Sequence, residues 1–439
     1  MLMDLDMQKI YSLAETAELL SVSKQTLRRW DEAGKLKPIR SPSNYRTYSS
    51  ESLTPYIGIN DNSCVRETKE DYYALKKYSV LELFAGAGGL ALGLEKAGLS
   101  CRLLNEIDRW ACKTLRKNRP NWNVIEGDVS KESFTHLKGQ IDIVTGGFPC
   151  QSFSYAGKKR GLDDARGTLF YEFARTVKEV EPLICVGENV RGLVSHDKGQ
   201  TLESMIRILE DLGYDVLPPQ VLKAVFYNVP QKRERLIIIG IKKGAGIDFT
   251  YPTPSSEMSI LSEALKAGGL YDTNVPVSAG QTYPERKKEI MDMIPPGGYW
   301  RDLPLDIQKE YMLKSFYLGG GKTGMARRIS WDEPSLTLTT SPAQKQTERC
   351  HPDETRPFQV REYARIQTFP DDWEFEGSTN QIYKQIGNAV PVNLAFAIGK
   401  ELVKALNAYT VKKELKHQYQ EAEVKQDKAA MQTKLFETV

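Results

Sequence analysis

The chain has 439 residues, of which 40% are hydrophobic and 27% charged, and its formal net charge is +3. This length exceeds a single small core and predicts two to three globular domains. The charge balance is only weak evidence against a nucleic-acid ligand, because acidic surface elsewhere can offset a basic cleft.

Two further features of the composition bound the class of protein. No stretch approaches the roughly 20 apolar residues of a membrane span, and the first ten residues, with Asp4 and Asp6, do not resemble a signal peptide. The six cysteines form no CxxC pair and there are only four histidines, so a zinc site or a disulfide framework is not expected. We expect a cytoplasmic protein with reduced thiols and with no metal or membrane partner.

Residues 1–55 predict a small helical unit followed by a wing. Residues 12–20 combine a polar cap with apolar residues at helical spacing. Residues 21–23 break this pattern and cap a second helix, which runs through Trp30 and stops at Gly34. The segment from Lys35 to Tyr48 then has the composition of a short β-wing.

The rest of the chain divides by changes in its hydrophobic pattern. Four short apolar runs of strand length, at 79–84, 141–144, 183–186 and 236–239, alternate with helical patterns. Such alternation predicts an α/β fold with a doubly wound, mostly parallel sheet and helices on both of its faces. The predicted domains are a linker at 56–77, a catalytic domain at 78–241, an irregular small domain at 242–374, a returning segment at 375–407 and a charged tail at 408–439, either a solvated helix or disordered.

A glycine-rich turn follows the first of these strands. Phe84-Ala-Gly-Ala-Gly-Gly89 opens a helix that ends near Gly98, and Glu106 lies twenty residues beyond Gly86. An acidic residue at that distance binds ribose hydroxyls in doubly wound folds, and Asp128, at the end of the next strand, could bind an adenine amino group. The alternative is that both acids only cap the helices that follow them.

Polar motifs also follow the later strands. Gly146-Gly-Phe-Pro-Cys-Gln-Ser-Phe-Ser154 places Cys150 among poor core formers, which favours an exposed and reactive thiol over a buried one. Glu188 stands at the end of another apolar run and could cap a helix or protonate a ring nitrogen. Arg233 and Arg235 alternate in an extended segment, so they are expected to share a face or to form a solvated pair.

The ordered set of motifs resembles the cytosine-5 DNA methyltransferase family. The set comprises Phe84-x-Gly86, Pro149-Cys150-Gln151, Glu188-Asn189-Val190, Gln231-x-Arg233-x-Arg235 and Gly387-Asn388-x-Val390-Pro391, where the segment from Gln385 is predicted to begin the last long helix. The run 361–371 resembles a further signature of the same family. The resemblance covers residues 78–407 and implies the fold of class I methyltransferases, with S-adenosylmethionine as the cofactor.

The resemblance implies roles for individual residues. Cys150 would attack carbon 6 of cytosine, Glu188 would supply or stabilise the N3 proton, and Arg233 and Arg235 would hold the base, its phosphate or Glu188. Asn189 would orient Pro149, and loop 151–168 would close over a base that has been flipped out of the duplex. The implied cofactor contacts are Phe84, Gly86, Gly88, Glu106, Ile107, Asp128, Val129, Pro149, Leu169, Asn388 and Val390.

DNA contacts are also implied, and they fall into two groups. Gln151, Ser154 and Gln231 belong to the motifs above, and Thr339 lies in the run 337–340, which is equally compatible with an ordinary strand. Residues 11–30 and 44–48 resemble the winged helix-turn-helix of MerR-like regulators and excisionases. That likeness implies groove contacts by Lys24, Gln25, Arg28, Arg29 and Arg46.

We therefore expect a methyltransferase that binds duplex DNA as a monomer at its methylation site. A restriction–modification role, with a cognate restriction endonuclease encoded nearby, would suit an N-terminal domain that represses its own operon. Two alternatives stay open: a tRNA cytosine-5 methyltransferase of the same fold, and a catalytically inactive DNA-binding repressor.

Overall fold

The computed structural model describes residues 10–12, 16, 31, 36–40, 46–49, 74–149, 168–318 and 323–436, with the side chains of 10, 40 and 416–436 left out. The chain forms two compact units, Met1–Glu70 and Asp71–Val439. The other predicted domain boundaries remain predictions.

The N-terminal unit contains a three-stranded antiparallel sheet in the order β1-β3-β2. Its strands are β1 (Ile10–Ser12), β2 (Ile39–Arg40) and β3 (Arg46–Ser49). The β2–β3 pair lies where the wing was predicted, and Arg46 Nε donates to Asp31 Oδ2 at 2.8 Å. The two predicted helices lie almost wholly outside the described residues, as do Lys24, Gln25, Arg28 and Arg29.

The second unit is built on an eight-stranded sheet in the order β10-β12-β8-β7-β4-β5-β6, with β9 also paired to β12. Strands β4 to β8 are parallel, whereas β12 runs antiparallel to β8, β9 and β10. The predicted mostly parallel sheet is confirmed. The strands are β4 (Ser79–Leu83), β5 (Ser100–Glu106), β6 (Asn123–Glu126), β7 (Ile143–Gly146), β8 (Ile184–Val190), β9 (Tyr214–Val216), β10 (Gln220–Lys223) and β12 (Glu234–Lys242).

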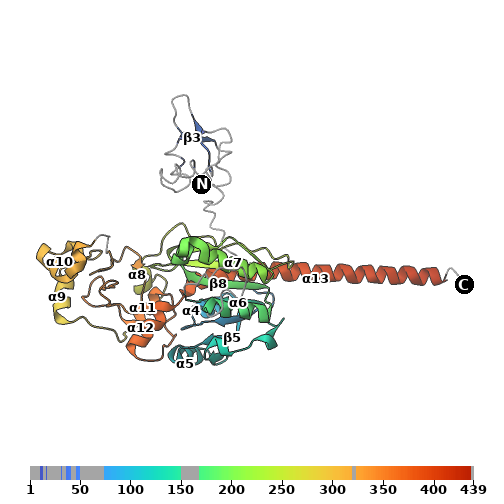
Figure 1. Ribbon diagram of the computed structural model, residues 1–439, viewed down its shortest axis with the longest axis horizontal. Helices are drawn as coiled ribbons and strands as arrows, with labels where there is room; N and C mark the ends of the chain where they lie inside the picture. Colours follow the sequence, from blue (N-terminus) through green and yellow to red (C-terminus); the bar gives the residue numbers. More distant parts are fainter. Residues whose placement is uncertain are drawn as a thin grey trace. The chain divides into compact units, whose positions relative to one another are not determined.

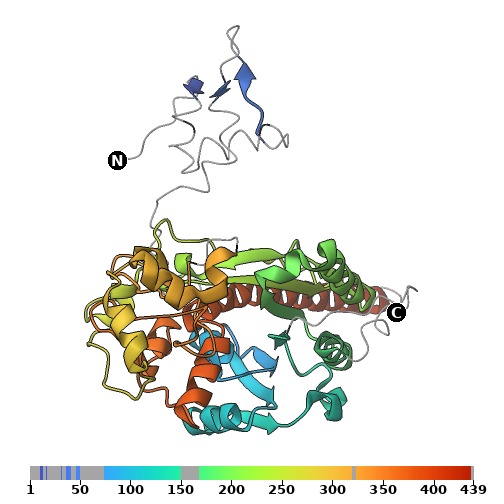
Figure 2. The same ribbon diagram turned by 60° about the vertical axis from the view of Figure 1, so that its left-hand side comes forward.

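Helices cover both faces of this sheet, because successive side chains of a buried strand point to opposite faces. Val80 packs with α4 (Gly89–Lys96) and the start of α13 (Val392–Phe436). Its neighbour Leu81 packs with α6 (Leu169–Val180) and α7 (Gln200–Asp211) on the other face. Figures 1 and 2 show the sheet between these layers, with α5 (Arg109–Asn118) beyond β5.

Residues 243–378 are called the small lobe below, and the part of them that the structure describes contains no strand of the large sheet. The lobe has its own core around Met291, Trp300 and Met312. A two-stranded parallel ladder of β11 (Gln231–Lys232) and β13 (Ser335–Leu336) joins it to the catalytic sheet. Its helices are α8 (Leu261–Leu265), α9 (Glu285–Asp292), α10 (Leu305–Met312) and α11 (Val360–Ile366).

The chain then returns to the large sheet through two helices. Residues Gln385–Asn388 end α12 (Thr379–Asn388), so the prediction that this motif begins the last long helix is wrong. Ala389 is already extended, with ψ 148°, and Pro391 keeps the helix from resuming at once, since it disfavours the helical region for Val390, the residue before it. Of the two alternatives for the tail, the structure has helix as far as Phe436. Within the described ranges no helix is long and apolar enough to span a membrane.

Candidate active site

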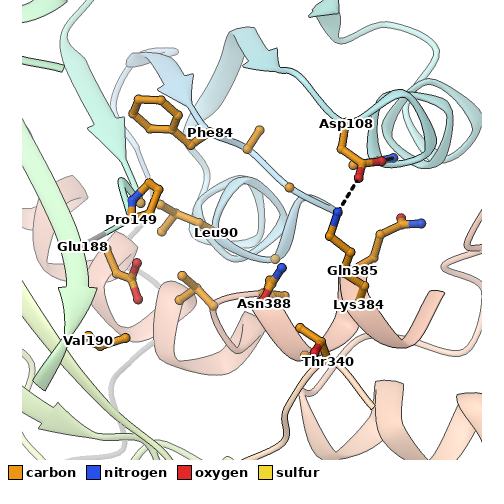
Figure 3. A pocket seen from close by; sticks show the side chains of 18 of the residues that line it. Phe84, Leu90, Asp108, Pro149, Glu188, Val190, Thr340, Lys384, Gln385 and Asn388 are labelled. Atoms are coloured by element: carbon orange, nitrogen blue, oxygen red, sulfur yellow. Dashed lines mark hydrogen bonds and ion pairs between the residues drawn. The ribbon is translucent and has the colours of Figure 1, made fainter. Parts of the chain in front are cut away.

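A cavity of about 890 Å³ lies at the carboxyl ends of the parallel strands, where ligands bind in doubly wound folds. Its walls come from β4, β5 and β8, from the small-lobe segment 337–340 and from the end of α12. Figure 3 shows Glu188 and Pro149 on one side of this cavity and Asp108 with Lys384 on the other. The predicted site residues that line it are Phe84, Gly86, Glu106, Ile107, Pro149, Glu188, Val390, Arg233, Arg235, Thr339 and Asn388.

Other predicted residues lie elsewhere. Leu169 begins α6, and Gly88 is the residue before α4. Asp128 caps the 3-10 turn Val129–Lys131 by accepting from Ser130 N at 3.0 Å, which is the capping role considered as the alternative for this residue. These residues and Gln231 are not among the described residues that line the cavity.

The glycine-rich turn holds its backbone in an unusual conformation. Phe84 has φ 59° and Gly86 has φ 54°, both in the left-handed region. Phe84 is not a glycine, so this conformation costs roughly 1–3 kcal/mol, a strain that clusters at ligand sites. A side-chain atom added at Gly86 would meet no protein atom within 4 Å, so the backbone here faces open space in which a ligand fits.

Glu106 is fixed by two backbone donors. Its Oε2 accepts from Gly86 N at 2.7 Å and its Oε1 from Asp108 N at 2.7 Å. The cap of α5 is Asp108, which accepts from Trp110 N and Ala111 N. Asp108, and not Glu106, therefore caps the helix that follows. Each Glu106 oxygen keeps a lone pair for a ligand hydroxyl. Beside it, Ile107 lines the cavity with 69% of its surface exposed, an apolar platform suited to a flat ring.

Glu82, which the motif analysis did not single out, lies beneath this turn. Its side chain is 2% exposed and lines the cavity, and its Oε2 has no hydrogen-bond partner among the described residues. Burial raises the pKa of Glu82 well above its ordinary value, and the nearby Glu106 and Glu188 act in the same direction. An orphaned buried carboxyl oxygen facing a cavity indicates a polar or cationic ligand group. The turn, Glu106, Ile107 and Glu82 therefore fit S-adenosylmethionine, which carries ribose hydroxyls, an adenine ring and two positive charges.

The other end of the cavity holds a buried ion pair. Glu188 Oε1 lies 2.6 Å from Arg235 Nε, with each side chain only 11% exposed. Strand pairing places them together. Arg235 is opposite Val190 in the β8–β12 ladder, and Glu188, two residues before Val190 in the same strand, is on the same face of the sheet. Asn189 Nδ2 donates to the carbonyl of Phe148 at 2.7 Å, directly before Pro149. Asn189 thus holds the carbonyl group of the residue that precedes Pro149, and its role in orienting Pro149 stays a prediction.

Pro149 is the last described residue before Cys150, Gln151 and Ser154, which lie outside the described residues together with most of loop 151–168. The described chain therefore reaches the cavity wall at Pro149, one residue before Cys150. The four cysteines that the structure does describe are buried, and burial raises the thiol pKa, to about 12 for Cys112 and Cys185 and to about 11 for Cys350. None of these four lines the cavity, so they are poor candidates for a nucleophile.

Arg233 does not share the setting of Arg235. It stands between β11 and β12 and is 2% exposed, and its guanidinium donates to the carbonyls of Leu338 and Gly387 at 3.2 and 3.0 Å. Gln231 is fully buried and accepts from Leu338 N at 2.9 Å. The alternation of Arg233 and Arg235 in an extended segment predicts that they share one environment. The chain instead breaks between β11 and β12, so Arg233 contacts backbone carbonyls and Arg235 contacts Glu188.

Sequence reasoning also missed a pair of charges at the mouth of the cavity. Lys384 Nζ lies 3.1 Å from Asp108 Oδ2, joining α12 to the start of α5 (Figure 3). Lys384 directly precedes the motif that begins at Gln385, and Asp108 follows Glu106 by two residues. Their nearness to those motifs was the only sequence signal, because the contact spans 276 positions of the chain.

Family profiles match both units. The profile of C-5 cytosine-specific DNA methylases matches residues 78–404. The profile of MerR family regulatory proteins matches residues 12–48. A crystal structure from Escherichia coli, of a prophage-encoded protein described as a DNA modification methyltransferase, aligns with a TM-score of 0.55 and 25% identity, covering 75% of this chain and all of that one.

Curated relatives extend over nearly the whole chain. The type II methyltransferase M.Eco47II of Escherichia coli is 62% identical over 400 residues, 90% of this chain and 96% of the relative. The type II methyltransferases M.PspPI of Psychrobacter and M.Sau96I of Staphylococcus aureus are 59% and 49% identical over 91% of this chain, and over 97% and 89% of their own lengths. The motifs, the sheet, the cavity and these relatives agree, and this chain belongs to the C-5 cytosine-specific DNA methylase family.

Proposed function

We propose that this protein transfers a methyl group from S-adenosylmethionine to carbon 5 of a flipped-out cytosine in a specific duplex DNA sequence. One observation carries the proposal. A single cavity holds Glu106 and the glycine-rich turn at one end, and the Glu188–Arg235 pair with Pro149 at the other. Pro149, the residue directly before Cys150, lines this second end. A cofactor site and a base site thus share one space.

At the cofactor end, Glu106 would accept the ribose hydroxyls and Ile107 would cover the adenine ring. Phe84, Gly86, Asn388 and Val390 would line the remainder of the molecule. S-adenosylmethionine supplies an electrophilic methyl group when it is bound. Gly88, Asp128, Val129 and Leu169 stay as predicted contacts only through the family resemblance.

At the base end, the Cys150 thiolate would form a bond to carbon 6 of cytosine. Glu188, held by Arg235, would donate a hydrogen bond or proton to N3, so that the electron pair displaced from the ring's double bond makes carbon 5 nucleophilic. After carbon 5 has been methylated, loss of its proton restores the double bond and expels Cys150 as a thiolate. Asn189 would fix the start of the cysteine loop through the Phe148 carbonyl.

We extend the proposal to the residues that contact DNA and to the role of the protein in the cell. Gln151, Ser154 and Thr339 would contact the DNA, and the small lobe would read the sequence through base edges. The type II relatives support a modification enzyme that protects DNA from a cognate restriction endonuclease. We place its action in the cytoplasm, as a monomer on DNA.

Methyl incorporation from labelled donor into duplex DNA and into tRNA tests the proposed substrate. We expect incorporation into duplex DNA, and bisulfite sequencing of the product should reveal one short sequence with one modified cytosine. Incorporation into tRNA alone would favour the tRNA-methylating alternative. Retained DNA binding without any methyl transfer would favour the inactive repressor.

For residues 1–55 we propose a second DNA-binding function, repression of the protein's own operon. The wing pair β2–β3 and the match to MerR family regulators support it. A footprint on the upstream promoter should disappear when residues 1–55 are deleted, while methylation persists. A footprint that survives the deletion would contradict this role.

A further inference from the structure

Three buried polar side chains link two segments that contribute to the cavity wall. Gln231, Arg233 and Gln367 are 0%, 2% and 0% exposed. They come from β11, from the turn after it, and from the end of α11 in the small lobe. Buried amide and guanidinium groups need partners, because an unsatisfied one costs about 1–3 kcal/mol. Their partners therefore show what these side chains hold together.

The partners on one side belong to the small-lobe segment Ser335–Thr340. Gln231 Oε1 accepts from Leu338 N at 2.9 Å, and Arg233 NH1 donates to Leu338 O at 3.2 Å. Both backbone groups of Leu338 are thus fixed by side chains that precede the catalytic strand β12. This segment includes Thr337, Thr339 and Thr340, which line the cavity.

The partners on the other side belong to the cofactor wall at the end of α12. Gln367 Nε2 donates to Ile386 O at 2.7 Å and to Ala389 O at 3.1 Å, and Arg233 NH2 donates to Gly387 O at 3.0 Å. Gln231 Nε2 closes the network by donating to Gln367 Oε1 at 3.0 Å. The adjoining residues Asn388 and Val390 line the cavity.

The two segments also touch directly. A side-chain atom at Gly387 would lie 2.1 Å from Thr339 O, so only glycine permits this approach. Among the residues that the structure describes, Arg233 donates to no carboxylate, and its Nε has no partner. Glu188 acts on Arg233 by charge alone, whereas the guanidinium is held by carbonyls of both segments, so moving either segment would leave it under-coordinated. We therefore expect that displacing the segment 335–340 also displaces the end of α12.

We propose that Gln231, Arg233 and Gln367 are positioning residues that couple cofactor binding at 386–390 to the order of the DNA-facing segment 335–340. This inference rests on the proposed function, which assigns 335–340 to DNA. Binding of a ligand at the cofactor end fixes the end of α12. The network then holds Leu338 and Thr339 in place before DNA arrives, which makes them ready to receive it.

Hydrogen exchange of the full-length protein, with S-adenosylhomocysteine as the probe, tests the coupling. In the wild type we expect saturating ligand to slow exchange in the peptide 84–108 and also in 335–340, by about fivefold or more, a usual size for coupling between sites. Ligand that binds and protects 84–108 but leaves 335–340 unchanged overturns the coupling alone. Failure of the ligand to bind overturns both the coupling and the proposed function.

Variants separate coupling from support of the fold. Gln367→Met keeps the length of the side chain and removes its hydrogen bonds, and should retain protection of 84–108 while losing it at 335–340. Gln281→Met is the matched control, because Gln281 also joins the small lobe to α12, through Ser341 and Asn380, but near the surface. It should keep both effects.

Arg233→Lys provides a second variant if Gln367→Met does not fold. It keeps the charge but reaches fewer carbonyls, so protection at 335–340 should be reduced and that at 84–108 kept. Wild-type protection at 335–340 in either variant overturns the proposal. So does a parallel loss of ligand binding and of protection at both peptides, which would mean that the network only supports the fold.

Discussion

The two ends of the cavity are built in different ways. Apart from the wall at Asn388 and Val390, the cofactor end is made of backbone geometry and short-range contacts: Glu106 binds Gly86 and Asp108, twenty and two residues away. The catalytic end is made of side chains brought from distant strands, such as Glu188 and Arg235. A site for a constant cofactor can be encoded locally, whereas a site for a flipped base depends on the packing of the whole sheet.

The largest expected effect lies at the catalytic end, in Cys150→Ser. Removing a covalent nucleophile should lower methyl transfer on the order of 10⁴-fold or more, while binding of S-adenosylhomocysteine stays unchanged because Cys150 is not expected at the cofactor end. A covalent adduct with 5-fluorocytosine DNA, resolved on a denaturing gel, measures it. The control is Cys64→Ser, outside the matched family region. An adduct in Cys150→Ser as strong as in the wild type would refute the mechanism.

The second-largest expected effect is a loss of stability when the buried Glu188–Arg235 ion pair is broken. Arg235→Met leaves Glu188 with its charge and without its partner, and breaking a buried pair in this way costs about 3–5 kcal/mol. The free energy of unfolding, measured with denaturant, should fall accordingly. The double variant Glu188→Gln with Arg235→Met should regain much of that stability and remain inactive. Equal losses in the single and double variants would show that the pair is not what stabilises this end.

At the cofactor end, Glu106→Gln should weaken ligand binding without a comparable loss of stability. Hydrogen bonds to a charged acceptor contribute about 1.5–3 kcal/mol, so the Kd for S-adenosylhomocysteine should rise about 10- to 150-fold, as measured by calorimetry. The amide oxygen can still accept from Gly86 N, which preserves the turn. An unchanged Kd would remove Glu106 from the cofactor site.

The same contrast explains what could be predicted from the sequence. Local patterns predict the turn after β4, the acidic residue Glu106 and the edge of the sheet at which the cavity lies. They suffice because the carboxyl ends of parallel strands meet at one edge. The environment of Arg233 could not be predicted, since its partners Leu338 and Gly387 are 105 and 154 positions away. The role of Gln367 could not be predicted for the same reason, since its partner Gln231 is 136 positions away. Pro391, by contrast, is a local signal that should have divided α12 from α13.

Glu82 offers a smaller, pH-dependent effect. Its pKa is raised by burial, so the folded state binds the proton more tightly than the unfolded state does. Stability from this group is fully present below the ordinary pKa of a glutamate and is lost progressively as the pH rises toward the pKa of Glu82 in the folded state. Glu82→Gln mimics the protonated form, and its free energy of unfolding should exceed that of the wild type increasingly from pH 5 upward. The exposed Glu285→Gln is the control, and a difference from wild type that is constant with pH would contradict the raised pKa.

The smallest effect expected is that of the ion pair at the cavity mouth. Lys384 is 57% exposed, and exposed pairs contribute about 0–1 kcal/mol. Lys384→Gln should therefore speed release of S-adenosylhomocysteine no more than about fivefold, in low salt only, because added ions screen the pair. Lys412→Gln removes a pair of the same 3.1 Å length to Asp248, outside the cavity, and should change nothing. A salt-independent effect of Lys384→Gln would instead mean that Lys384 touches the ligand. The cofactor end would then depend on a charged side chain of α12 in addition to the wall at Asn388 and Val390, and the contrast between the two ends would narrow.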